Sequence, residues 1–90
     1  MSTTESQADD IMLYSNPNNG IFTLYGSVFQ KENCSFAIHD LSGKLVHQEF
    51  MKKEKTQTFN LQNQLVSGNY FIQINNSKNE KLKVFKMIVR

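Results

Sequence analysis

The hydrophobic positions of the chain come in short runs that are separated by polar turns. From Ile11 onward, runs rich in apolar, aromatic and β-branched residues alternate with Gly, Asn, Ser and Lys clusters about every ten residues, a spacing typical of a sandwich or barrel. No window of about ten residues combines helical periodicity with capping residues. The pattern predicts an all-β domain with strands at Ile11–Tyr14, Ile21–Tyr25, Cys34–His39, Leu45–Met51, Thr56–Leu61, Asn69–Asn75 and Leu82–Val89.

Alternation along these strands predicts which side chains face the core. Tyr70, Ile72 and Ile74 give the cleanest alternation. The other residues predicted to point inward are Phe22, Leu24, Cys34, Phe36, Ile38, Val46, Phe50, Phe59 and Leu61. The last strand is irregular, because Leu82 and Val84 have one parity whereas Phe85, Met87 and Val89 have the other. A bulge, or burial of both faces, would reconcile the two.

Turn-forming residues define the connections between the strands. Proline fixes φ and lacks an amide donor, whereas Gly and Asn tolerate left-handed backbone. Asp40-Leu41-Ser42-Gly43 predicts a tight hairpin, Asn75–Glu80 predicts a longer polar one, and Leu65 is expected to tuck beneath the sandwich. The fold-defining turn residues are predicted to be Asn16, Pro17, Gly20, Asp40, Gly43 and Gly68.

Size and charge limit the classes of function. Ninety residues form one domain, and a net charge of +2 gives no strong field for nucleic acid or acidic lipid. Cys34 is the only cysteine, so no internal disulfide can form and a buried apolar role is expected. Residues 1–10 are polar and predict a flexible linker or an added leader. With no signal peptide and no run long enough for a membrane span, the chain is either cytoplasmic or a fragment of a longer secreted protein.

Residues able to carry chemistry are few. His39 and His47 flank the predicted hairpin and could face each other, which raises a zinc hypothesis, but further ligands are missing nearby. Two solvent-facing histidines are the expected alternative. Asp9, Asp10 and Asp40 lack the spacing of a calcium loop. The sequence therefore predicts no enzyme, no metal site and no cofactor.

The order of several motifs resembles the C-terminal sorting domains of the type IX secretion system. Tyr14–Phe22 is similar to that family's opening motif "YPNPxxGxF", with Ser15 where the family usually has proline. Phe36–Val46 resembles its hairpin motif with Asp and Gly-Lys, and Leu65–Ile74 resembles its "L-x-x-G-x-Y" strand. Phe85–Arg90 resembles its basic and apolar terminal segment. The resemblance extends from about Ile11 to Arg90.

The resemblance implies an immunoglobulin-like β-sandwich of about seven antiparallel strands over residues 11–90, attached to the C-terminus of a cargo protein. Such domains direct cargo of Bacteroidota through the periplasm and across the outer membrane to the cell surface or beyond. The implied partners are the translocon, its outer-membrane shuttle and a surface sortase that cuts in or before Ser2–Asp10; no nucleic acid is expected. The residues expected to be recognised are Lys81, Lys83, Lys86, Met87, Ile88, Val89 and Arg90.

The alternative interpretation is a generic immunoglobulin- or fibronectin-like binding or spacer module of a secreted protein. Lysines on and beside the last strand fit both interpretations, because they can form a recognition surface or protect a sheet edge from aggregation. Loss of export on substituting these lysines, with folding intact, is the result that separates a sorting signal from a spacer.

Overall fold

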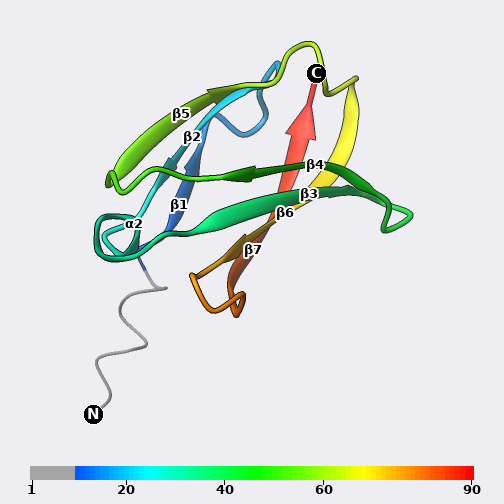
Figure 1. The fold of residues 1–90 in the computed structure, drawn as a ribbon. Coiled ribbons are helices and arrows are strands. Elements are labelled where there is room, and N and C mark those ends of the chain that lie inside the picture. Colours follow the sequence, from blue (N-terminus) through cyan, green and yellow to red (C-terminus); the bar gives the residue numbers. More distant parts are fainter. Residues whose placement is uncertain (1–9) are drawn as a thin grey trace.

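Two antiparallel sheets pack face to face in the computed structural model, which describes residues 10–90 (Figure 1). One sheet has the strand order β1-β2-β5 and the other has the order β4-β3-β6-β7. The elements are β1 Met12–Tyr14, β2 Ile21–Tyr25, α2 Val28–Lys31, β3 Ser35–Asp40, β4 Leu45–Phe50, β5 Thr56–Asn60, β6 Gly68–Asn75 and β7 Lys81–Val89. The predicted β-sandwich is confirmed, and each predicted strand boundary lies within one residue of the observed one.

The core lies between the two sheets. Almost all of the residues that alternation assigned to it are buried or packed against it, and Leu65 is buried as expected. Phe22 and Phe59 come from the three-stranded sheet, and their rings lie 5.9 and 4.8 Å from the ring of Phe36 in the four-stranded sheet. Aromatic pairs in edge-to-face geometry add attraction beyond the burial of their area. These three rings therefore join the two layers.

Both edge strands of the four-stranded sheet carry a β-bulge. The register of β3 and β4 shifts after Ile38, where Val46 is the extra residue, and the register of β6 and β7 shifts after Ile74, where Leu82 is extra. Both extra residues pack against the core. Because an inserted residue inverts the alternation beyond it, a bulge reconciles the two parities of the last strand, and Val84 faces outward.

The prediction that Phe50 points into the core is wrong. Phe50 pairs with Ser35 on the outer face and is 83% exposed. Beyond the bulge, His47 and Glu49 take the inward-facing positions opposite Ile38 and Phe36. Alternation counted from Val46 without the bulge therefore places Phe50 on the wrong face of the sheet.

One end of the sandwich is closed by the single turn of α2, which the sequence did not predict. Its residues Val28 and Phe29 are buried. Ser27 directly precedes α2, and its amide and hydroxyl donate hydrogen bonds to the carboxylate of Asp10 at 3.2 and 2.6 Å. Asp10, assigned to the linker from sequence, is thus bonded to the domain, and the rest of that linker lies outside the described residues. No helix within residues 10–90 is long and apolar enough to cross a bilayer.

The hairpin between β3 and β4 is held by one carboxylate oxygen. Oδ1 of Asp40 accepts hydrogen bonds from the amides of Ser42 and Lys44 at 2.9 and 3.0 Å, and from the Ser42 hydroxyl at 2.6 Å. These hydrogen bonds lower the pKa of Asp40 below its usual value, and the bond from the Ser42 hydroxyl has the largest effect. Gly43 has a φ of 89°, which a side chain rarely adopts. In this turn Asp40 accepts the local hydrogen bonds and Gly43 supplies the positive φ.

Candidate functional site

The opening turn and the last strand are hydrogen-bonded to each other, although they lie at opposite ends of the sequence. The carboxamide of Asn16 uses both polar atoms: Nδ2 donates to the carbonyl oxygen of Lys86 at 2.8 Å, and Oδ1 accepts from the amide of Ile88 at 3.0 Å. An amide side chain offers the same donor and acceptor as a peptide group. Asn16 therefore stands where a neighbouring strand would pair with β7.

The backbone of Asn18 continues this pairing. Its amide donates to the carbonyl oxygen of Ile88 at 2.9 Å, and its own carbonyl accepts from the amide of Arg90 at 2.8 Å. These bonds form an isolated parallel bridge between Asn18 and Val89. We call the four hydrogen bonds from Asn16 and Asn18 to residues 86–90 the Asn clamp. The clamp covers the outer backbone edge of β7 over its final residues.

Local bonds fix the turn that carries the clamp. The side chain of Asn18 accepts a hydrogen bond from the amide of Gly20 at 2.8 Å, and the carbonyl of Gly20 accepts one from Leu61 at 2.8 Å. Gly20 has a φ of 103°, and a Cβ atom there would lie 2.8 Å from the Cα atom of Gln62. Both the backbone conformation and the lack of space therefore require glycine at this position.

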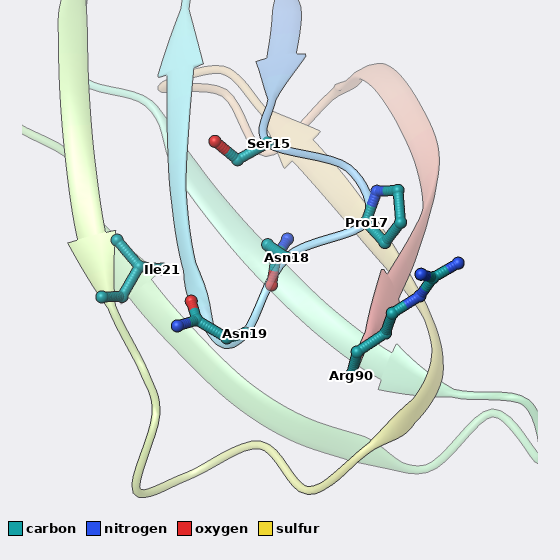
Figure 2. A pocket seen from close by; sticks show the side chains of 6 residues that line it. All are labelled: Ser15, Pro17, Asn18, Asn19, Ile21 and Arg90. Carbon is teal, nitrogen blue, oxygen red and sulfur yellow. The ribbon is translucent and has the colours of Figure 1, made fainter.

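An open depression of about 550 Å³ lies beside the clamp (Figure 2). Figure 2 shows Pro17 and Arg90 next to each other at its rim, with Ser15 and Asn19 on other sides. Arg90 is the one charged side chain among its lining residues, so the depression provides no acid and base for catalysis. Ser15 has a φ of 67°. A proline ring fixes φ near −65°, so the family's usual proline cannot adopt the conformation that Ser15 has here.

β7 presents its residues alternately to the core and to the outer face. Met87 and Val89 are 0% and 3% exposed, so a partner cannot contact their side chains while the domain is folded. Lys86 pairs with Phe71 and Ile88 pairs with Asn69 on the outer face of the sheet. Of the apolar residues expected to be recognised, only Ile88 faces outward.

The basic residues of β7 are also divided between the two sides. Lys83 pairs with the buried Ile74 on the inward-facing side, and its ammonium lies 5.6 Å from the ring centroid of Phe85, a distance at which a cation attracts an aromatic face. Lys81, Lys86 and Arg90 are exposed. The structure therefore brings Lys86 and Ile88 together on one face and places Lys83 on the other. Their role in recognition stays a prediction.

The residues considered for metal binding do not come together. His39 lies opposite Phe71 on the outer face, whereas His47 faces inward, with its Nε2 atom 3.0 Å from Oε1 of Glu49. The two rings therefore lie on opposite faces of the sheet, and neither a shared site nor two solvent-facing rings is observed. Asp9 lies outside the described residues. Across residues 10–90 there is no group of three or more His, Cys, Asp or Glu side chains that could hold a metal ion.

Cys34 lies in the core, as predicted, and its thiol is free. Burial, followed by the negative charge of Glu32, raises the pKa of Cys34 to about 11. The nucleophilic form of cysteine is the thiolate, and this thiol stays protonated at neutral pH. Cys34 therefore acts as an apolar core residue.

The model of the family described as secretion system C-terminal sorting domain matches residues 12–90, a range that includes both sides of the Asn clamp. The chain belongs to this family. The resemblance drawn from the motifs between Tyr14 and Arg90 is thereby confirmed. Membership implies the C-terminal region of an exported protein, and it favours a domain that sorts over one that catalyses.

The fold of this sorting domain is shared with a solved structure. It is similar to a DUF3244 family protein with an immunoglobulin-like β-sandwich fold from Bacteroides vulgatus, with a TM-score of 0.65 and 13% sequence identity, over 89% of this chain and 82% of that one. At that identity the likeness concerns the fold, which is the immunoglobulin-like sandwich predicted from the motifs. No match is found among curated proteins.

The Asn clamp was missed by reasoning from sequence. From sequence, Asn16 is expected only to form a turn, and the last strand is expected to be a separate surface for recognition. Nothing in the local sequence indicates that this side chain reaches a strand 70 positions away. The one available signal was the Asn within the family's "YPNPxxGxF" opening, which matches Asn16 by position.

Proposed function

We propose that this chain is a signal domain that directs an attached cargo protein through the type IX secretion system across the outer membrane. The observation that carries the proposal is the match of the sorting-domain family over residues 12–90. The clamp supports it, because the terminal segment is bonded on one edge to β6 and on the other to the opening turn. The secretion machinery would therefore recognise a folded domain and not an unfolded segment.

The partners in this proposal are the translocon, its outer-membrane shuttle and a surface sortase. Cleavage by the sortase is expected ahead of the folded domain, in or before Ser2–Asp10. Ile11 is buried and Asp10 is bonded to Ser27, so cutting beyond these residues would require the end of the sandwich to open. The cargo would leave with the part of the chain that precedes the cut.

A generic binding or spacer module is the competing function. The immunoglobulin-like fold is equally compatible with such a module, because one fold serves many functions. The family match favours sorting over spacing. Export of a fused protein is the property that a spacer does not have.

The test is a fusion of residues 1–90 to the C-terminus of a periplasm-directed fluorescent protein in a host with an active type IX system. We expect the reporter on the cell surface or in the medium. The unfused reporter, and the fusion in a strain without the translocon, should both stay in the periplasm. Retention of the fusion in the competent host, with the domain folded, would contradict the proposal.

A further inference from the structure

The Asn clamp limits what a partner can contact on the last strand. From Lys86 to Arg90 the backbone edge that faces away from β6 already has hydrogen-bonding partners in Asn16 and Asn18. A partner cannot add a strand to this stretch without displacing them. Met87 and Val89 are turned into the core. In this part of β7 a partner can therefore contact the outward-facing side chains, but neither the backbone edge nor the side chains of Met87 and Val89.

These outward-facing side chains continue onto β6 as one patch. Lys86 pairs with Phe71, and the β7 residues on either side of Lys86 on the same face are Val84 and Ile88. Phe71 is 39% exposed and Val84 is 44% exposed. Diagonal neighbours across strands lie within reach of an aromatic ring. We call Phe71, Val84, Lys86 and Ile88 the β6–β7 patch.

The outward-facing strand positions around this patch carry basic side chains and no acidic one. By the strand register, the outward positions of β4, β3, β6 and β7 hold apolar, amide, hydroxyl and basic side chains, and no carboxylate. Lys81 pairs with Asn75 on this same face, and Arg90 is exposed just beyond the last residue of β7. The outer face of the three-stranded sheet differs, because it has Thr23 and Thr58 hydroxyls bonded to each other at 2.9 Å. The face that carries the patch is apolar at its centre and positively charged around it. It is therefore complementary to a partner surface that is apolar at its centre and carries carboxylates at its rim.

We propose that the export machinery recognises the folded domain through the β6–β7 patch, by a protein surface that covers Phe71 and Val84 and places carboxylates against Lys86. This inference rests on the proposed function and specifies which surface performs it. A second copy of the chain is disfavoured as the occupant, because pairing two such patches would bring Lys86 and its neighbouring cations together. Large exposed apolar side chains grouped within a polar surround are a mark of interaction surfaces.

The test compares residue pairs that differ in position but not in chemistry. Phe71→Ser is matched by Phe50→Ser, because both rings lie on the same sheet face and Phe50 is on the far edge strand. Lys86→Glu is matched by Lys53→Glu, the same change at an exposed lysine in the loop between β4 and β5, outside the residues expected to be recognised. Each is made in the reporter fusion, and folding is checked by circular dichroism and thermal unfolding.

We expect Phe71→Ser and Lys86→Glu each to reduce the exported fraction by about tenfold or more, as for loss of an anchor residue at an interface. The two matched controls and Lys86→Arg should be exported like the unmodified fusion. If Phe71→Ser lowers the unfolding temperature, Val84→Asp replaces it and should give the same loss. Normal export of the patch variants, or an equal loss in both controls, overturns the inference.

Two further outcomes are distinguishable. If the unmodified fusion is itself retained, the proposed function fails and the assignment of the patch fails with it. Sedimentation of the isolated chain is expected to show a monomer. A dimer that Phe71→Ser converts to a monomer would show that a second copy covers the patch, and would also overturn the inference.

Discussion

Two turns of this domain are both built from turn-forming residues, but their hydrogen bonds span very different distances along the sequence. The Asp40–Lys44 turn satisfies its own amides through one carboxylate, and every partner lies within four residues. The opening turn uses Asn16 and Asn18 to bind Lys86, Ile88 and Arg90. The comparison shows that a turn-forming side chain can serve the local bend or the distant strand, and that its type alone does not decide which.

The two turns also differ in how tightly the surrounding structure encloses them. A Cβ atom on Gly20 would lie 2.8 Å from the backbone of Gln62, whereas one on Gly43 would meet nothing within 4 Å. Both glycines have a positive φ. The opening turn is therefore packed against the domain and the hairpin turn projects from it, which predicts unequal effects for identical substitutions.

The largest difference is expected between Gly20→Ala and Gly43→Ala. Both variants place a side chain in the left-handed region, which costs about 1 kcal/mol. Gly20→Ala adds a backbone clash, so a loss of about 2–4 kcal/mol in the free energy of unfolding is expected, against about 1 kcal/mol for Gly43→Ala. Urea unfolding of both variants measures the difference. Equal losses would mean that the opening turn relaxes as freely as the hairpin.

An intermediate effect is expected for Asn16→Ala. Two exposed hydrogen bonds to β7 are lost, which corresponds to a loss of about 1–2 kcal/mol in the free energy of unfolding. The amide of Ile88 should also exchange with solvent faster, because Asn16 is its acceptor. Hydrogen exchange followed by NMR is the measurement. Asn19→Ala, an exposed residue of the same turn, is the control, and faster exchange there as well would rule out a specific clamp.

The smallest effect concerns pH and the hairpin turn. Hydrogen bonds lower the pKa of Asp40 in the folded state, so its stabilisation is present above the ordinary carboxyl pKa of about 4 and is lost as the pH falls through the lowered folded value. Asp40→Asn keeps an acceptor oxygen but removes the charge, so it should weaken the dependence of the unfolding temperature on pH in the acid range.

Asn16→Asp provides the contrast for that experiment at the other turn. Asn16 needs its Nδ2 donor for the carbonyl of Lys86, and a carboxylate has no donor at neutral pH. This variant should therefore regain stability on acidification, as protonation restores a donor. If both variants show the same dependence on pH, the two turns do not differ in the way that their hydrogen bonds indicate.

Much of this fold could be predicted because its rules are local. Alternation placed Phe22, Tyr70 and Ile72 in the core, and the chemistry of Asp40 and Gly43 located a turn. The helix α2 was missed because a single turn has no period to detect. Phe50 was assigned to the wrong face because a bulge shifts the register and leaves no clear mark in the sequence.

The candidate site was less predictable, because it depends on which distant segments meet. The motifs identified the family, and the strand that carries Lys83, Lys86 and Ile88 was predicted. The role of these residues in recognition stays a prediction. Which of them face outward depends on the bulge at Leu82, and Phe71 joins Lys86 only through the register of β6 and β7. Long-range pairing of this kind is decided by tertiary structure, so the sequence could indicate the strand but not the surface.

The clamp also has a consequence for the order in which the domain folds. Asn16 and Ile88 are 72 positions apart, and closing so long a loop is among the slower steps of folding. The opening turn cannot obtain its partners until β7 has been synthesised and has docked on β6. A chain that is interrupted before β7 lacks the clamp even if its other strands pair. The clamped state is therefore a structural mark that β7 has been synthesised and has docked on the sandwich.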